Sequence, residues 1–227
     1  MKAYLGFFFT FLALVSETSY CQTCCSGGVP LSNNLGVPNE GKGAIFIGLS
    51  YDYNNLNTLN AGAETLNDDS RLRITNSMLL SLGYSISDRL SVESLFTWVN
   101  QSRTITQFGN ETLTETSGLG DAVFLLKYDL PNVIGKESLF SFGGGVKVPF
   151  GRSDFLSPQG IQLTADLQPG SGAWDVVGLL SASKKLPFRP SATVSSSVTL
   201  GFTGVNPDYL NGLSTYEFGD ELQVNIG

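Results

Sequence analysis

Charged side chains stand at intervals within segments that otherwise alternate apolar and polar residues. Successive side chains of a strand point to opposite faces, so residues of one parity share a face. Interior charges must be paired or hydrated, because an isolated charge in a low-dielectric space is costly. The residues that fall on the polar parity carry both signs, and they are Glu93, Asp121, Lys127, Lys147, Asp175, Glu217 and Glu221. We expect them to line the interior of a barrel, its lumen.

Two interpretations of these charges stay open. In the first, Lys127 and Lys147 satisfy Asp121, Asp175 and the glutamates inside a filled barrel. Small barrels of about eight strands have interiors that side chains fill, which favours this interpretation. In the second, the charges line a pore and tune which solutes pass, as inward residues do in porins. The pore requires more strands than the sequence displays.

Catalytic chemistry is poorly represented in this chain. There is no histidine, so the usual base that activates a serine or a water at neutral pH is missing. Neither a G-x-S-x-G nor an H-E-x-x-H motif occurs. A net charge of −7 argues against a nucleic-acid partner, which needs a basic face. We therefore expect no enzyme, no catalytic residue and no cofactor.

The first residues resemble an export signal. Lys2 precedes an apolar run from Leu5 to Val15, and Ser19-Tyr20-Cys21 forms a tolerable cleavage site. This pattern predicts a secretory signal peptide over residues 1–21. The alternatives are a buried apolar helix and lipidation at Cys21, which the large Tyr20 disfavours.

Residues 22–42 form a segment rich in Cys, Gly and Pro, ahead of the barrel domain over residues 43–227. Its adjacent Cys24 and Cys25 are expected to lie in a tail. Pairing with a second chain is an alternative in an oxidising compartment. Two thiolates without histidine make a thin metal site, since structural zinc wants four ligands, so we expect no metal.

Eight alternating segments follow, of which the first two cover residues 44–53 and 74–86. The stretches between segments are alternately long and short, and they are 54–72, 87–89, 100–118, 131–137, 151–172, 186–190 and 203–213. Tight turns on one rim and longer loops on the other are typical of outer-membrane barrels. A soluble sheet has no reason to keep this asymmetry.

The alternation also gives each segment a face suited to lipid. In one segment Val194, Val198 and Leu200 oppose Ser197 and Thr199. Spans of about 9–11 residues suffice for a tilted transmembrane strand, and no apolar run past the N-terminus suggests a spanning helix. The sequence predicts an all-β, antiparallel, up-and-down transmembrane β-barrel of about eight visible strands in the outer membrane of a Gram-negative bacterium.

Three motifs carry a resemblance to a known family. Lys147 to Ser153 has the form K-x-P-x-G-x-S, Gln168 to Asp175 has the form Q-P-G-[ST]-G-[SA]-W-D, and Gly118 to Asp121 has the form G-[LI]-G-D. In these motifs the chain resembles the outer-membrane barrels of the MetA-pathway of phenol degradation family, over nearly all of its mature length. The resemblance implies passive, porin-like transport of small, hydrophobic or aromatic compounds. The implied partners are membrane lipid, the insertion machinery and a small solute.

Members of that family run on for several more strands, whereas this sequence stops at Gly227 within an alternating pattern. We therefore expect the sequence to be truncated at its C-terminus. Strands one and eight could otherwise close on each other. The stretch 151–172 is expected to form a structured external turn, with an inward constriction as the alternative. The alternative to transport is a structural or surface-binding role for a filled barrel. A membrane enzyme and a soluble secreted β-sandwich are the remaining alternatives.

Overall fold

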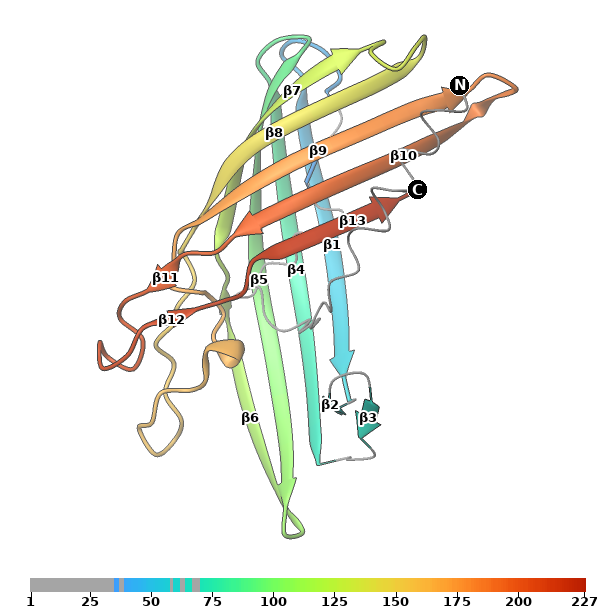
Figure 1. The fold of residues 1–227 in the computed structure, drawn as a ribbon. Coiled ribbons are helices and arrows are strands. Elements are labelled where there is room, and N and C mark those ends of the chain that lie inside the picture. The colour runs from blue at the N-terminus through green and yellow to red at the C-terminus, as the bar shows by residue number, and fades with distance from the viewer. Residues whose placement is uncertain (1–34, 37–38, 58, 62–63, 67–69) are drawn as a thin grey trace.

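The computed structural model describes residues 35–36, 39–57, 59–61, 64–66 and 70–227. Its main feature is an antiparallel sheet that curls into a half-barrel (Figure 1). Eight strands follow one another in it, namely β1 (Ile45–Leu56), β4 (Arg71–Ser85), β5 (Leu90–Gln107), β7 (Ala122–Pro131), β8 (Ser138–Val148), β9 (Asp175–Leu186), β10 (Arg189–Phe202) and β13 (Glu221–Ile226). The all-β up-and-down architecture predicted from the alternation is confirmed.

The remaining elements are small. Strand β6 (Asn110–Leu119) pairs with the far part of β5, while β2 (Leu59–Ala61) pairs with β3 (Glu64–Leu66). A second small hairpin joins β11 (Val205–Asn206) to β12 (Tyr216–Glu217), and a single 3₁₀ turn, η1, covers Ala165–Leu167. Within the described residues β1 and β13 are the two edges of the main sheet and do not pair with each other.

Each strand of the main sheet presents two unlike faces. In β5 the side chains of Val92, Phe96 and Trp98 lie on the outer face, whereas Glu93 and Leu95 lie buried on the inner, concave face. The same division continues around the sheet, and half-exposed apolar side chains of the outer face include Leu80, Leu126, Phe142, Val146, Leu180 and Val194. The alternation in the sequence therefore gives the sheet an apolar outer face and an inner face with both polar and apolar residues.

The hairpin of β5 and β6 differs from the sequence prediction. Residues 100–118 were expected to be a loop, but they continue the ladder well beyond the end of β7 (Figure 1). Strand β4 follows β5 on the other side as far as Ile105. Beyond Trp98 the outer parity turns polar at Asn100 and Ser102, so the apolar outer face ends and the period-two signature is lost. Phe108 and Gly109 close the hairpin with positive φ at both positions, as a type I′ turn requires.

Connections of different length lie at the two ends of the half-barrel. The short turns 86–89, 132–137 and 187–188 lie at one end, where Ser87 Oγ accepts the backbone N–H of Leu90. The β2–β3 hairpin, the longer connections 149–174 and 203–220, and the β5–β6 hairpin lie at the other end (Figure 1). The two rims of the predicted barrel are therefore unlike, as the gap lengths indicated.

Part of the inner face is an apolar cluster from four strands. Its members are Leu79, Leu95, Val123, Leu125, Val177 and Leu179. Strand β8 runs between β7 and β9 and contributes Gly145, which is paired with Leu125 on one side and Val177 on the other. Because Gly145 has no side chain, the side chains of Leu125 and Val177 can pack over β8 at this position. Leu35, ahead of β1, packs against the cluster.

No helix among the described residues is long and apolar enough to cross a membrane.

The predicted signal peptide over 1–21 and the cysteines Cys21, Cys24 and Cys25 lie outside the described residues. So does most of the predicted segment 22–42, of which residues 35–36 and 39–42 are described. These interpretations stay predictions, as does the division into domains.

Gly145 and Gly144 provide a matched test of the close packing of β7 on β8. A Cβ at Gly145 would meet the Phe124 carbonyl oxygen and would lie 2.8 Å from Leu125 Cα, whereas a Cβ at Gly144 meets nothing within 4 Å. We expect Gly145→Ala to lower the free energy of unfolding by about 1–3 kcal/mol, the usual cost of overpacking. Urea unfolding in detergent measures it. Equal stability of Gly145→Ala and the control Gly144→Ala would contradict the packing described.

Candidate functional site

Lys127 is the centre of a buried ion-pair cluster on the inner face. Its ammonium nitrogen lies 3.4 Å from Glu93 Oε1 and 3.8 Å from Asp129 Oδ1. All three side chains are almost fully buried. The other carboxylate oxygen of Glu93 accepts the backbone N–H of Gly36 at 2.8 Å. A charged group of the wall thereby holds a segment that precedes β1.

That segment leaves the interior over the short-turn rim. The Asn39 side chain donates to the Ser87 carbonyl at 3.2 Å, and Asp88 Oδ1 accepts the backbone N–H of Lys42 at 3.1 Å. Gly43 N–H then donates to the Ser85 carbonyl at 2.8 Å, immediately before β1 begins. The described residues ahead of β1 therefore occupy part of the inner face at this end.

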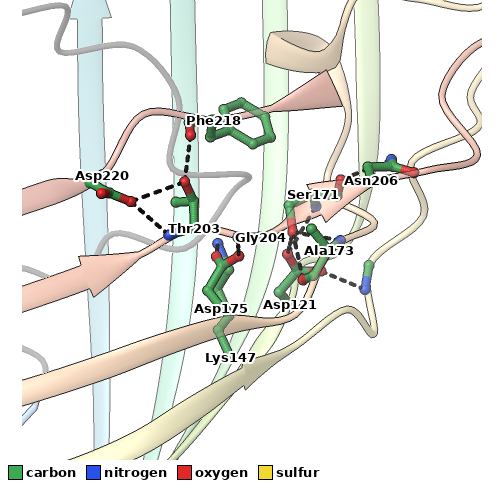
Figure 2. Close-up of polar contacts among 11 residues, drawn as sticks. Asp121, Lys147, Ser171, Ala173, Asp175, Thr203, Gly204, Asn206, Phe218 and Asp220 are labelled. Carbon is green, nitrogen blue, oxygen red and sulfur yellow. Dashed lines mark hydrogen bonds and ion pairs between the residues drawn. The ribbon is translucent and has the colours of Figure 1, made fainter. Parts of the chain in front are cut away.

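A second buried ion pair links β8 to β9. Lys147 and Asp175 lie directly opposite each other in the register, and their side chains form a salt bridge (Figure 2). Both are nearly fully buried. Asp175 Oδ1 also accepts the backbone N–H of Gly204 at 2.9 Å, which attaches the chain after β10 to the wall (Figure 2).

Asp121, between β6 and β7, anchors the loop that joins β8 to β9. One of its oxygens accepts the Gly151 N–H at 3.1 Å. The other accepts the Ser171 N–H at 2.9 Å and the Ser171 hydroxyl at 2.6 Å (Figure 2). The Asn206 side-chain amide donates to the Ser171 carbonyl at 3.0 Å, so a second long connection joins the same point. Asp121 is fully buried, and these donors give both of its carboxylate oxygens hydrogen-bond partners.

Glycines let two backbone stretches meet beside Asp121. A Cβ on Gly170 would lie 2.5 Å from the Gly151 carbonyl carbon, and one on Gly151 would lie 2.5 Å from Gly170 Cα. Gly172 has φ +69°, in the region that favours glycine. The three motifs that carry the family resemblance, 118–121, 147–153 and 168–175, therefore meet at one place through Asp121, Gly151, Ser171 and the Lys147–Asp175 pair.

The loop over residues 149–174 folds inward against the wall. Thr116 donates its hydroxyl to the Leu167 carbonyl at 2.6 Å, and Leu167 is fully buried. The buried Gln168 accepts the Phe155 N–H at 2.9 Å and donates to the Leu163 carbonyl at 3.0 Å, which braces the loop on itself. The loop is thus structured, and it packs against inner-parity side chains at the long-loop end. The external position expected from the sequence stays a prediction.

Two arginines of the inner face bind the same loop. Arg73 of β4 and Arg103 of β5 are directly opposite in the register. Each places its Nη1 3.5 Å from Asp166 Oδ2, on η1. In the same loop the exposed Arg152 donates to Asp154 at 2.9 Å, and this hydrogen bond lowers the pKa of the exposed Asp154 carboxyl.

The residues predicted to line the lumen fall in different places. Glu93, Lys127, Lys147 and Asp175 are buried on the inner face of the sheet, and Asp121 is buried at the loop anchor. Glu221 has the inner parity of β13 and is half-buried, whereas Glu217 is exposed on the small β11–β12 hairpin, off the main sheet. That they line an open lumen stays a prediction.

Sequence reasoning missed several partners. Asp129 follows Lys127 at the same parity, so period two could have found it. Arg73 and Arg103 lay in stretches interpreted as a strand boundary and a loop. Ser171 lies in the 168–175 motif, but its partner Asp121 could not be found from that motif, and no pattern reveals the backbone N–H of Gly36.

The antiparallel sheet is curved, its outer face is apolar, its ion pairs are buried inside and its two rims are unlike. This is the architecture typical of outer-membrane β-barrels. No protein-family model and no curated protein sequence matches the chain. Among solved structures, it is similar to the crystal structure of an outer membrane channel from Pseudomonas putida F1, with 18% identity and a TM-score of 0.61. The match covers 87% of this chain and 69% of that one, and it establishes the fold. Membership of the MetA-pathway family is not shown.

Asp121 is expected to hold the 149–174 loop in place. Asp121→Asn replaces one accepting oxygen with a donor, so the Ser171 or Gly151 N–H loses its partner, at a cost of about 1–3 kcal/mol. Hydrogen exchange of loop amides should accelerate. The control Asp154→Asn changes an exposed carboxylate of the same loop and should leave exchange unaltered. Unchanged protection in Asp121→Asn would refute the anchor.

The Lys147–Asp175 pair makes a separate prediction about stability. Lys147→Met leaves a buried carboxylate without its cation, which typically costs about 3–5 kcal/mol. Lys184→Met, at an exposed position on β9, is the matched control and should cost little. Urea unfolding of the two variants in detergent decides, and equal midpoints would contradict a buried pair.

Proposed function

We propose that the chain forms the wall of an outer-membrane channel for passive transport of small compounds. The observation that carries the proposal is the contrast between its two faces. Apolar side chains such as Leu126 and Phe142 are half-exposed on the outer face, while Lys127 and Lys147 are paired on the inner face. Lipid outside and a polar path inside account for both.

The outer face also indicates where the bilayer would end. Strand β5 has 18 residues, which at roughly 3.3 Å per residue is about twice the ~30 Å hydrocarbon core. Its outer parity is mostly apolar up to Trp98, with Val92 and Phe96, and polar from Asn100 onward. An aromatic ring at such a transition suits the membrane interface. The β5–β6 hairpin would then project into the external medium.

The class of solute is part of the same proposal. The apolar cluster that includes Leu79, Leu95 and Leu179 lies on the inner face next to the ion pairs. These side chains are at most 2% exposed, so the proposed solute class, small hydrophobic or aromatic compounds, rests on the family resemblance. The similar structure from Pseudomonas putida F1 is described as an outer membrane channel, and this agrees with the proposal.

One observation favours the alternative of a filled barrel with a structural or surface-binding role. Leu35 covers the apolar cluster, Gly36 binds Glu93, and the 149–174 loop occupies the long-loop end. Small barrels of this kind have interiors that side chains fill. In that case the exposed connections at the long-loop rim would be the working surface.

The partners proposed are membrane lipid around the outer face and the insertion machinery of the outer membrane. A strand edge left unpaired in lipid costs several kcal/mol for each backbone group, so β1 and β13 require strand partners in the membrane. The small solute is the third partner.

Conductance of the full-length protein in planar bilayers tests the proposal. A channel gives discrete current steps in potassium chloride, and vesicles that contain it swell in a small neutral solute. Heat-modifiable migration on a denaturing gel shows separately that the barrel has folded. Folded protein without current steps or swelling would support the filled barrel instead.

A further inference from the structure

Arg73 and Arg103 place two positive charges side by side on the inner face. They are directly opposite in the antiparallel register of β4 and β5. Residues in this relation have Cβ atoms about 4.5–5.5 Å apart, and like charges there repel. An anion close to both guanidinium groups relieves this repulsion.

Asp166 supplies that anion from the 149–174 loop. Its Oδ2 lies 3.5 Å from the Nη1 of each arginine. Close hydrogen bonds between charged groups are shorter, about 2.7–2.9 Å, so neither contact is tight. The Asp166 side chain is also 30% exposed. Its carboxylate is thus held loosely and within reach of solvent.

Neutral oxygens keep the guanidinium groups in position. Arg73 Nη2 donates to the Asp166 backbone carbonyl at 2.6 Å and to Gln101 Oε1 at 3.1 Å. Arg103 Nη1 donates to the Thr164 hydroxyl at 3.1 Å. None of these bonds uses the Asp166 carboxylate, so both arginines stay oriented when that carboxylate turns away.

The exposure of these cations sets them apart from the buried lysines. The side chains of Arg73 and Arg103 are 14% and 23% exposed, whereas those of Lys127 and Lys147 are 3% and 4% exposed. A solute can approach the arginines without breaking a fully buried pair. Their place beside η1, at the long-loop end of the inner face, is where a solute from outside would first meet the wall.

We propose that Arg73 and Arg103 form an anion site in which the carboxylate of a solute takes the place of the Asp166 carboxylate. The site rests on the proposed channel function, which it deepens by giving the solute a charged group. A monocarboxylate with an apolar body combines the charged group that this site would bind with the hydrophobic or aromatic character proposed for the solute of the channel.

Ion selectivity of the full-length protein provides the first test. In a potassium chloride gradient, Arg73→Gln/Arg103→Gln is expected to lower the chloride-to-potassium permeability ratio by about two- to fivefold, the size of an interaction between partly exposed charges. An unchanged ratio in conducting channels of this variant would overturn the anion site.

Asp166→Asn should shift the ratio in the opposite direction, because it removes the competing carboxylate and keeps both arginines. The controls Arg152→Gln and Asp154→Asn alter an exposed pair in the same loop and should leave the ratio as it is. If the variants acted only by disturbing the loop, the controls would change the permeability ratio in the same direction as Asp166→Asn. Equal shifts in the two sets would therefore count against the site.

Binding of benzoate to the detergent-purified protein, followed by calorimetry, tests the site without a current. We expect binding that weakens at least about fivefold in Arg73→Gln/Arg103→Gln and tightens in Asp166→Asn. Wild-type protein without conductance but with this pattern of binding would overturn the channel and keep the site. Conductance with no benzoate binding, or with binding equal in all variants, would overturn the site and keep the channel.

Discussion

Charges on the concave face must find their partners inside the protein, and this requirement shapes the connections as much as the wall. Glu93 holds the backbone of Gly36, Asp121 holds Gly151 and Ser171, and Asp175 holds Gly204. Each of these carboxylates accepts a hydrogen bond from a backbone N–H that belongs to a different segment of the chain. The segments before β1, after β8 and after β10 are therefore bound to the interior by the same physical need.

The lysines complete the same arrangement from within the sheet. Lys127 lies close to Glu93 and Asp129, and Lys147 pairs with Asp175 on the next strand. Because cation and anion stand on the wall itself, their distance is fixed by strand spacing and register rather than by flexible loops. The apolar cluster between them shares the inner face, so charge pairing and apolar packing stabilise the same curvature.

Period two in the sequence was enough to predict the sheet, its two faces and the inner positions of Glu93, Lys127, Lys147 and Asp175. It failed in the β5–β6 hairpin, where the outer face of β5 turns polar at Asn100 and the alternation is lost although the backbone ladder continues. Glu217 followed the alternation but sits on a separate hairpin, since Gly219 and Asp220 interrupt the strand. The inward fold of 149–174 depends on Asp121, Arg73 and Arg103, whose contacts no local pattern encodes.

The β5–β6 hairpin has a mechanical consequence. Its two strands are continuous with the wall, and the register runs unbroken from Trp98 paired with Leu119 to Gln107 paired with Asn110. Such a ribbon turns with the sheet beneath it, so a small tilt of β5 sweeps the fully exposed Phe108 through a much larger arc. The position of the hairpin tip therefore reports the tilt of the wall. A spectroscopic probe attached at the tip would move farther than one attached to the strands, so it would detect smaller changes in tilt.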